Sequence, residues 1–251
     1  MAKMLNRSLI KSQVREQLKT AQVAPKGMTA FYMALAMVLN VLVFFCDGAG
    51  LPSMFLTILA NLLSIVLDAG FILYCFAVCR NERFEYLSLF DGFSFTGKLV
   101  LLYLIRSAYT FLWSMLFVIP GIIATYRYRF AVYNLCENPD LSVTDALRLS
   151  VQQTYGYKMQ LFNLDMSYLG WTLLSMLPML VTEVSTFISS ADFLAYMSTP
   201  STLPAILLQG GWSLVVSLFY YPNYICANLM YFESAKTAER ASGSPDGLGG
   251  I

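Results

Sequence analysis

Five ionisable residues lie inside long apolar stretches of this 251-residue chain, where charged side chains are costly. They are Asp68, Arg106, Arg127, Arg129 and Asp165. Carboxylates and guanidiniums can form ion pairs, and an arginine in excess can bind a phosphate or carboxylate through its planar fork of N–H donors. Buried ion pairs can equally serve only to fix the register of the helices. The five residues are therefore candidates for a ligand site or for structural ion pairs.

The composition excludes several other kinds of site. The chain has no histidine, so neither a Ser-His-Asp triad nor an HExxH zinc site is possible. Without other soft ligands nearby, the cysteines are interpreted as packing residues. A net charge of +1 gives no field that would recruit nucleic acid. We expect no enzyme activity, no cofactor, no metal and no nucleic-acid partner. The cysteines are Cys46, Cys75, Cys79, Cys136 and Cys226.

The elements that carry these charges are apolar runs of membrane-spanning length. Hydrophobic residues make up 57% of the chain and charged residues only 12%, against roughly 25% charged in a soluble domain. A helix needs about 20 apolar residues to cross the hydrocarbon core. The sequence therefore predicts an all-α, polytopic transmembrane bundle. The expected spans cover about residues 28–46, 54–79, 98–119, 120–136, 159–181 and 204–232.

The run from residue 98 to residue 136 is too long for one crossing, because a straight helix of that length would measure about 58 Å against a core of about 30 Å. It is either a hairpin of two spans or one span followed by an emerging helix. The hairpin leaves every lysine and arginine cytoplasmic or within the membrane, as the positive-inside rule favours. We therefore expect a hairpin turn at Pro120 and Gly121, with both termini in the cytoplasm.

The N-terminal segment, residues 1–26, predicts an amphipathic cytoplasmic helix. Its cations Arg7, Lys11, Arg15 and Lys19 recur every four residues. The helix either binds the surface of an anionic leaflet or is a solvated helix packed on the rest of the protein. The transmembrane domain covers residues 27–235, and a disordered cytoplasmic tail is expected over residues 236–251.

Three local features are expected within the transmembrane domain. Ser142 or Thr144 can cap a short helix. Pro178 and Pro222 are expected to kink their helices. Trp212 and a group of tyrosines are interpreted as interface anchors or packing aromatics. These tyrosines are Tyr220, Tyr221 and Tyr224.

The intramembrane charges are expected at similar depths in the cytoplasmic half of the membrane. Asp68, Arg106, Arg127 and Asp165 lie about 10–16 Å from the cytoplasmic ends of their spans at 1.5 Å per residue. Two residues of a continuous helix that are two apart point about 200° apart. We therefore expect Arg127 to face Asp165 or Asp68 and Arg129 to reach the interface near Glu137, with the reverse assignment open.

Several pieces of the chain, spread over about residues 5–235, resemble one protein family in order and spacing. They are LNRSLIKSQVREQLK, LSLFDGF, FLWSMLFVIPGIIATYRYRFAVYNLCENPDLSVTDALRLS, LFNLDMSYLGW and YYPNYICANLMYFE. The chain resembles the bacterial multi-pass membrane proteins of domain of unknown function 975. That family is distantly similar to the membrane portion of glycerophosphodiester phosphodiesterases. The resemblance implies a multi-pass protein of the bacterial cytoplasmic membrane, and no catalytic residues can be carried over from it.

Two functions are compatible with the sequence. The protein binds or helps to move an amphiphilic or anionic ligand, a lipid or peptide, through a charged cavity in the cytoplasmic half of the membrane. Alternatively it is a non-catalytic scaffold or accessory subunit whose buried charges are structural. The lipid bilayer, including anionic lipids, is the expected partner, and the sequence leaves the oligomeric state open.

Overall fold

The structure is a computed structural model that describes residues 7–46, 51–189 and 202–243. Within these ranges the chain is helical and contains no strand, so the all-α prediction is confirmed. The long helices are α2 (Pro25–Cys46), α3 (Leu51–Arg80), α4 (Thr96–Leu116) and α11 (Leu203–Gly243). The shorter elements are α1 (Arg7–Thr20), the 3₁₀ helix η1 (Tyr86–Phe95), α5 (Val118–Arg127), α6 (Ala131–Glu137), α7 (Val143–Gln153), α8 (Lys158–Ser175) and α9 (Leu177–Ser189).

Four helical stretches in the described ranges are long and apolar enough to cross a membrane. A fifth crossing is added if α8 and α9, which meet at 53°, count as one bent span. The fourth predicted span, residues 120–136, is not one helix, because α5 ends at Arg127 and α6 begins at Ala131. The four stretches are Pro25–Cys46, Met54–Arg80, Tyr86–Leu116 and Leu203–Ala238.

The chain turns back on itself between α4 and α5. Phe117 is extended, with φ −160° and ψ 153°, and α5 then packs along α4. The predicted turn at Pro120 and Gly121 is therefore misplaced, since both residues lie in the first turn of α5, where a proline is tolerated. Gly121 allows the two helices to approach closely, because a Cβ atom there would lie 2.1 Å from Ser114 Oγ.

Both ends of this hairpin segment lie at the same end of the bundle. Lys98 Nζ, in the first turn of α4, donates a hydrogen bond of 2.5 Å to the carbonyl oxygen of Pro139, which follows α6. A hairpin requires this return, whereas a single span that continues outward would separate residues 98 and 139.

The segment that returns from the hairpin turn, α5 and α6, is interrupted at residues 128–130. Side chains of α7 and of Thr154 directly after it form hydrogen bonds with the backbone groups that the break leaves open. The hydroxyl of Ser150 donates to the carbonyl oxygen of Arg127 at 2.9 Å and accepts from the backbone N–H of Phe130 at 3.1 Å. Thr154 Oγ1 also donates to the Arg127 carbonyl, at 3.2 Å. Non-helical backbone at membrane depth is tolerated where the protein satisfies its polar groups in this way.

The predicted short helix after residue 142 is confirmed as α7. Ser142 is its N-cap, and its hydroxyl accepts from the backbone N–H of Asp145 at 3.1 Å. Ala146 and Leu147 are buried on its apolar face. The cap and the apolar face together hold α7 where Ser150 and Thr154 reach the break.

Pro178 lies in the first turn of α9, directly after the 53° bend between α8 and α9, as predicted for a kink. Proline has no backbone N–H and therefore cannot donate to the carbonyl of Leu174, four residues before it. The indole Nε1–H of Trp212 on α11 donates to that carbonyl at 2.8 Å. The tryptophan thus stabilises the bend rather than acting only as a packing aromatic.

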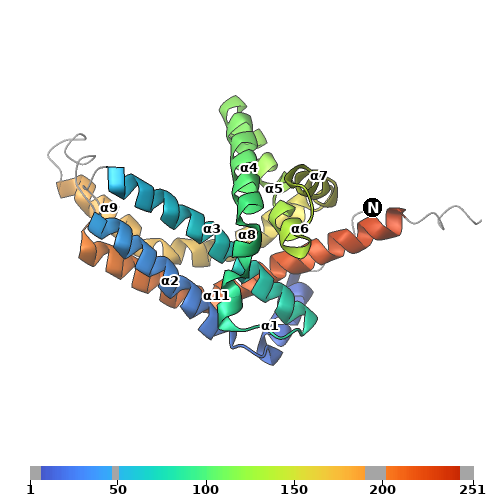
Figure 1. Ribbon diagram of the computed structural model, residues 1–251, viewed down its shortest axis with the longest axis horizontal. Coiled ribbons are helices and arrows are strands. Elements are labelled where there is room, and N and C mark those ends of the chain that lie inside the picture. The colour runs from blue at the N-terminus through green and yellow to red at the C-terminus, as the bar shows by residue number, and fades with distance from the viewer. Residues whose placement is uncertain (1–6, 47–50, 190–201, 244–251) are drawn as a thin grey trace, which may run out of the picture.

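The bundle has two arms that share a base (Figure 1). One arm contains α2, α3, α9 and the first part of α11, and the α4–α5 hairpin stands away from it (Figure 1). The core lies near the base, where Phe71 of α3, Phe130 and Phe232 of α11 are fully buried. Apolar side chains at the hairpin tip, such as Phe117 and Val118, are exposed, as expected for a surface in contact with lipid tails.

The N-terminal helix α1 packs on the rest of the protein, as the second of its two predicted interpretations requires. Its apolar residues Ile10, Val14 and Leu18 are buried, and the helix packs on α11 and α3. These three side chains are therefore covered by the protein itself. Residues 1–6 of the predicted amphipathic segment lie outside the described residues.

Part of the predicted disordered tail, residues 236–251, is helical. Helix α11 continues to Gly243, with Ala235 buried and Lys236 in an ion pair. The prediction of disorder is wrong for residues 236–243, which are helical, and the ion pair of Lys236 with Glu137 stabilises the start of this part of the helix. Residues 244–251 lie outside the described residues.

Candidate functional site

A cavity of about 180 Å³ lies where α3, α4, α6 and α11 meet, and we call it the junction cavity. Three of the five predicted charges line it, so spans distant in sequence bring their ionisable side chains together. The polar lining residues are Asp68, Tyr103, Arg106, Arg129, Tyr133, Tyr221, Tyr224 and Asn228.

Arg129 and Asp165 form a bidentate ion pair at the edge of the junction cavity. Arg129 Nη1 lies 2.7 Å from Asp165 Oδ2, and Nη2 lies 2.8 Å from Oδ1. Tyr126 Oη donates to Oδ2 at 2.7 Å and Tyr224 Oη donates to Oδ1 at 3.0 Å. Arg129 Nη2 also donates to Tyr224 Oη. Each carboxylate oxygen thus has two donors, and the pair is satisfied within the protein.

The expected assignment of the two neighbouring arginines is reversed in the structure. Arg127 does not pair with Asp165 or Asp68, and its guanidinium lies 5.9 Å from the ring centroid of Tyr128. The expectation assumed a continuous helix, but α5 ends at Arg127 and the following turn directs Arg129 into the bundle. Arg129 therefore does not reach Glu137.

Asp68 lies half-buried on α3 with one oxygen engaged. Tyr32 Oη on α2 donates to Asp68 Oδ1 at 2.5 Å. The Tyr32 ring stacks on Tyr221 at 5.6 Å between centroids and 7° between planes, which fixes the hydroxyl in place. This contact joins α2, α3 and α11 around the carboxylate.

Arg106 differs from the other charges of the junction cavity because it has no partner. Its guanidinium makes no hydrogen bond or ion pair with any residue in the described ranges. The positive charge of Arg129, which lines the same cavity, repels the Arg106 guanidinium. Asn228, also in the lining, donates through Nδ2 to the carbonyl of Tyr224 at 2.8 Å, whereas its Oδ1 is buried without a partner.

The tyrosines are the functional residues that the sequence interpretation missed. Tyr32, Tyr126 and Tyr224 all donate to intramembrane carboxylates. Two signals could have found Tyr126 and Tyr224. Tyr126 directly precedes the arginine pair in the sequence, and Tyr221, Tyr224 and Asn228 have the i, i+3, i+7 spacing of one helix face.

A second group of charges joins α3, α6 and α11 beyond the cavity. Glu137 pairs with Arg80 at 2.7 Å and with Lys236 at 2.5 Å, and Arg80 also pairs with Glu233 at 3.1 Å. Burial by itself would raise the pKa of Glu137, but the hydrogen bonds from Lys236 and Arg80 outweigh it and lower the pKa below its ordinary value. This cluster joins the ends of α3 and α6 to residues 233–236 of α11.

Two of the four N-terminal cations contact the protein itself. Arg7 Nη1 donates to the carbonyl of Asn163 at 3.1 Å, and Lys11 Nζ lies 4.2 Å from the Tyr168 ring centroid. Burial, followed by repulsion from Arg7 and Arg15, lowers the pKa of Lys11. Arg15 and Lys19 are exposed. Binding of these four residues to an anionic membrane surface stays a prediction.

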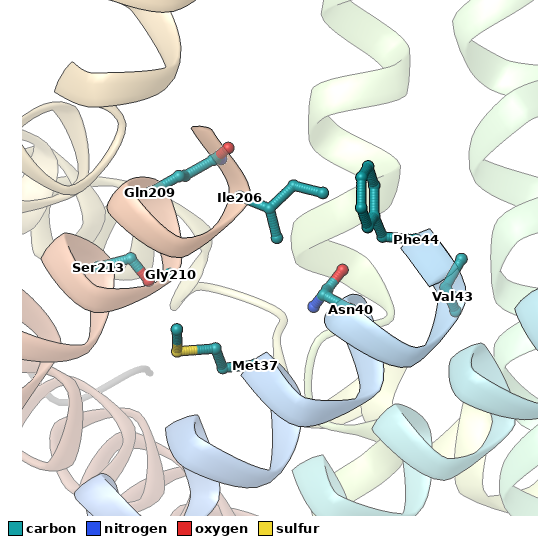
Figure 2. A pocket seen from close by; sticks show the side chains of 8 residues that line it. All are labelled: Met37, Asn40, Val43, Phe44, Ile206, Gln209, Gly210 and Ser213. Carbon is teal, nitrogen blue, oxygen red and sulfur yellow. The ribbon is translucent and has the colours of Figure 1, made fainter. Parts of the chain in front are cut away.

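A larger crevice of about 410 Å³ lies between α2 and α11 (Figure 2). Among the residues that the structure describes, its polar lining consists of Asn40, Gln209 and Ser213, and none of the lining residues is charged (Figure 2). The crevice therefore offers less for an ionic ligand than the junction cavity does. In the part of the chain that the structure describes, no group of three or more His, Cys, Asp or Glu side chains could hold a metal ion.

Residues 115–239 match a family described as Protein of unknown function (DUF975). The segment that matches DUF975 contains Arg129, Asp165 and Tyr224, whereas Asp68 and Arg106 precede it. No curated protein and no solved structure matches the chain. The distant similarity to glycerophosphodiester phosphodiesterases stays a prediction.

Proposed function

We propose that this protein binds the anionic group of an amphiphile, a lipid or peptide, in the junction cavity, with Arg106 as the ligand-binding residue. The observation that carries the proposal is the absence of any partner for the Arg106 guanidinium among the described residues. An arginine at membrane depth costs about 2.5–3.5 kcal/mol on insertion scales, and a bound phosphate or carboxylate offsets this cost through a bidentate contact.

The surroundings of the junction cavity support an amphiphilic ligand. A groove of about 340 Å³ lies along α8 and α11 and shares Tyr221 and Tyr224 with the cavity. Met166 and Leu169 are among the apolar side chains that line it. A ligand with its anionic group on Arg106 can therefore place an apolar chain in this groove or against the exposed apolar arms of the bundle.

Arg129 has a positioning role in this proposal. Its guanidinium is already neutralised by Asp165 and is therefore not free to bind an anion. The pair lies between the cavity, which Arg129 lines, and the groove, which Asp165 lines. The proposed role is binding or assistance in transport, without catalysis, in the bacterial cytoplasmic membrane. Helices long and apolar enough to cross a membrane support this location.

Native mass spectrometry of the purified full-length protein tests the proposal. We expect a co-purified lipid or peptide on the wild type and its loss in Arg106→Gln. The matched control is Arg83→Gln, which removes the same charge from an exposed position outside the cavity and should retain the ligand. If wild type and Arg106→Gln carry the same amount of bound ligand, the assignment of Arg106 is overturned.

A scaffold function is the second candidate, and the Arg129–Asp165 pair favours it. This pair is fully satisfied without a ligand, as a purely structural pair should be. A folded Arg106→Gln protein that keeps every binding partner and every bound lipid would support the scaffold over the ligand-binding function.

A further inference from the structure

We propose that the junction cavity selects a zwitterionic group, with the anion on Arg106 and an ammonium on Asp68. This inference rests on the function proposed above and adds the charge type of the ligand. The shared chemistry is an ammonium a few bonds away from a phosphate or carboxylate, as in a phosphoethanolamine lipid head or a free amino acid.

The first support is the state of the Asp68 carboxylate. Its Oδ1 accepts from Tyr32, and Oδ2 has no partner among the described residues. An ammonium donates up to three hydrogen bonds and complements this free oxygen. The half-buried carboxylate lines the cavity, so a ligand can reach it.

The second support is the balance of charge around the cavity. Asp165 is committed to Arg129, which leaves one carboxylate and one guanidinium without an ionic partner. No ion pair of the described chain joins Asp68 to Arg106, although both line the same cavity. A ligand that carries both charges can pair with both residues at once. A purely anionic ligand would pair only with Arg106 and would lie close to the unpaired, negatively charged Asp68.

The third support is the aromatic lining beside Asp68. Phe71 lies one helical turn after Asp68 on α3, and its ring lies 4.9 Å from that of Tyr221. Aromatic faces attract ammonium groups, and the attraction strengthens where water is excluded. The Asp68 side of the cavity thus combines a carboxylate with two aromatic rings, which is a favourable setting for a cation.

The test measures binding of short-chain lipids to the purified full-length protein in detergent by native mass spectrometry. Three probes share the same chains: phosphatidylethanolamine, N-acetylated phosphatidylethanolamine, which lacks the ammonium, and phosphatidylglycerol. We expect the wild type to bind the first probe about tenfold more tightly than the other two, the size of one charge-assisted hydrogen bond. Asp68→Asn should remove this preference, whereas the exposed control Asp91→Asn should retain it.

The outcomes separate this inference from the proposed function. Equal affinity of the wild type for all three probes, together with loss of binding in Arg106→Gln, overturns zwitterion selection and leaves the anion site standing. Equal binding of all three probes to wild type and Arg106→Gln overturns both. The acetylated probe tests the ammonium on wild-type protein, so the result stands even where Asp68→Asn does not fold.

Water-soluble competitors then identify the source of the zwitterion. Displacement of the lipid by glycerophosphoethanolamine or a free amino acid supports a soluble ligand of this chemistry. Failure of both competitors, with the lipid preference intact, supports a lipid head group. Glycerol phosphate carries the anion but no ammonium. If it displaces the lipid as effectively as the zwitterions do, the role of Asp68 is overturned.

Discussion

The guanidinium of Arg129 donates two hydrogen bonds, 2.7 and 2.8 Å long, to the carboxylate of Asp165. The pair joins the turn between α5 and α6 to α8, and Tyr224 on α11 contacts both partners. Only 14% of the arginine side chain and 24% of the aspartate side chain is exposed. Three segments of the chain are therefore fixed relative to one another at the edge of the junction cavity.

Breaking this pair on one side is expected to destabilise the fold more than removing both charges. Arg129→Gln and Asp165→Asn should each lower the free energy of unfolding by about 3 kcal/mol, because each leaves one charge unpaired. The double variant should recover part of that loss. Denaturant unfolding in detergent measures the coupling, and strictly additive effects of the two substitutions would contradict a structural pair.

Ser150→Ala should destabilise the break between α5 and α6. The substitution leaves the Phe130 N–H without its acceptor and takes one of two donors from the Arg127 carbonyl, a loss of about 2 kcal/mol. Thermal unfolding in detergent measures it. The control Ser12→Ala removes an exposed hydroxyl in α1 and should change stability by less than about 0.5 kcal/mol. Equal effects of the two substitutions would argue against a bridging role for Ser150.

Trp212→Phe should cost about 1 kcal/mol, because it removes the donor that satisfies the Leu174 carbonyl at the Pro178 bend. In a Pro178→Ala background an alanine N–H can supply this hydrogen bond, so the cost of Trp212→Phe should shrink. A double-mutant cycle by denaturant unfolding tests the coupling. An unchanged cost in the alanine background would show that the indole acts only by packing.

The Glu137 cluster should make stability depend on pH in the acid range. The pKa of Glu137 is lower in the folded protein, so its contribution is present above the unfolded pKa of about 4.5 and is lost as the pH falls below it. Glu137→Gln should cost about 1 kcal/mol at pH 7, a figure kept small because the Arg80 side chain is 39% exposed. Thermal unfolding of both proteins should converge as the pH falls through the lowered pKa of Glu137 in the folded state. A difference in thermal stability between the two proteins that persists in acid would show that packing, and not the charge of Glu137, causes the loss.

Cysteine labelling can test the sidedness of the hairpin. A cysteine at Val118, next to the turn at Phe117, should react with an impermeant maleimide added to intact cells, whereas Asn138→Cys should react only after the membrane is opened. Cys46 and Cys79, the two cysteines that are not buried, are first changed to serine. Labelling of Val118→Cys only from the cytoplasm would contradict the hairpin.

The sequence predicts the helical class because the relevant signals are local. Apolar run length gives α2, α3, α4 and α11 to within a few residues at most of their ends, and Ser142 marks the start of α7. The turn near residue 117 follows from the length of the run before it, although Pro120 misplaced it by three residues. Proline is compatible with a first helical turn, so its position alone does not fix where a helix begins.

The choice between Arg127 and Arg129 depended on tertiary structure. Local sequence gives no reason for α5 to end at Arg127, because the break exists only where Ser150 and Thr154 of α7 satisfy the open backbone groups. The same break rotates Arg129 toward Asp165 and withdraws Arg127 from the cavity.

By itself, the sequence determined that this is an all-α chain with spans of membrane length and five charges that need partners, since run length and residue type are properties of the chain alone. Only the tertiary structure decided which charges meet. Pairing depends on the directions of side chains from α3, α4, α8 and the turn between α5 and α6, and these directions are set by packing among helices far apart in sequence. That packing satisfies Asp165 and leaves Arg106 and one oxygen of Asp68 facing the same cavity.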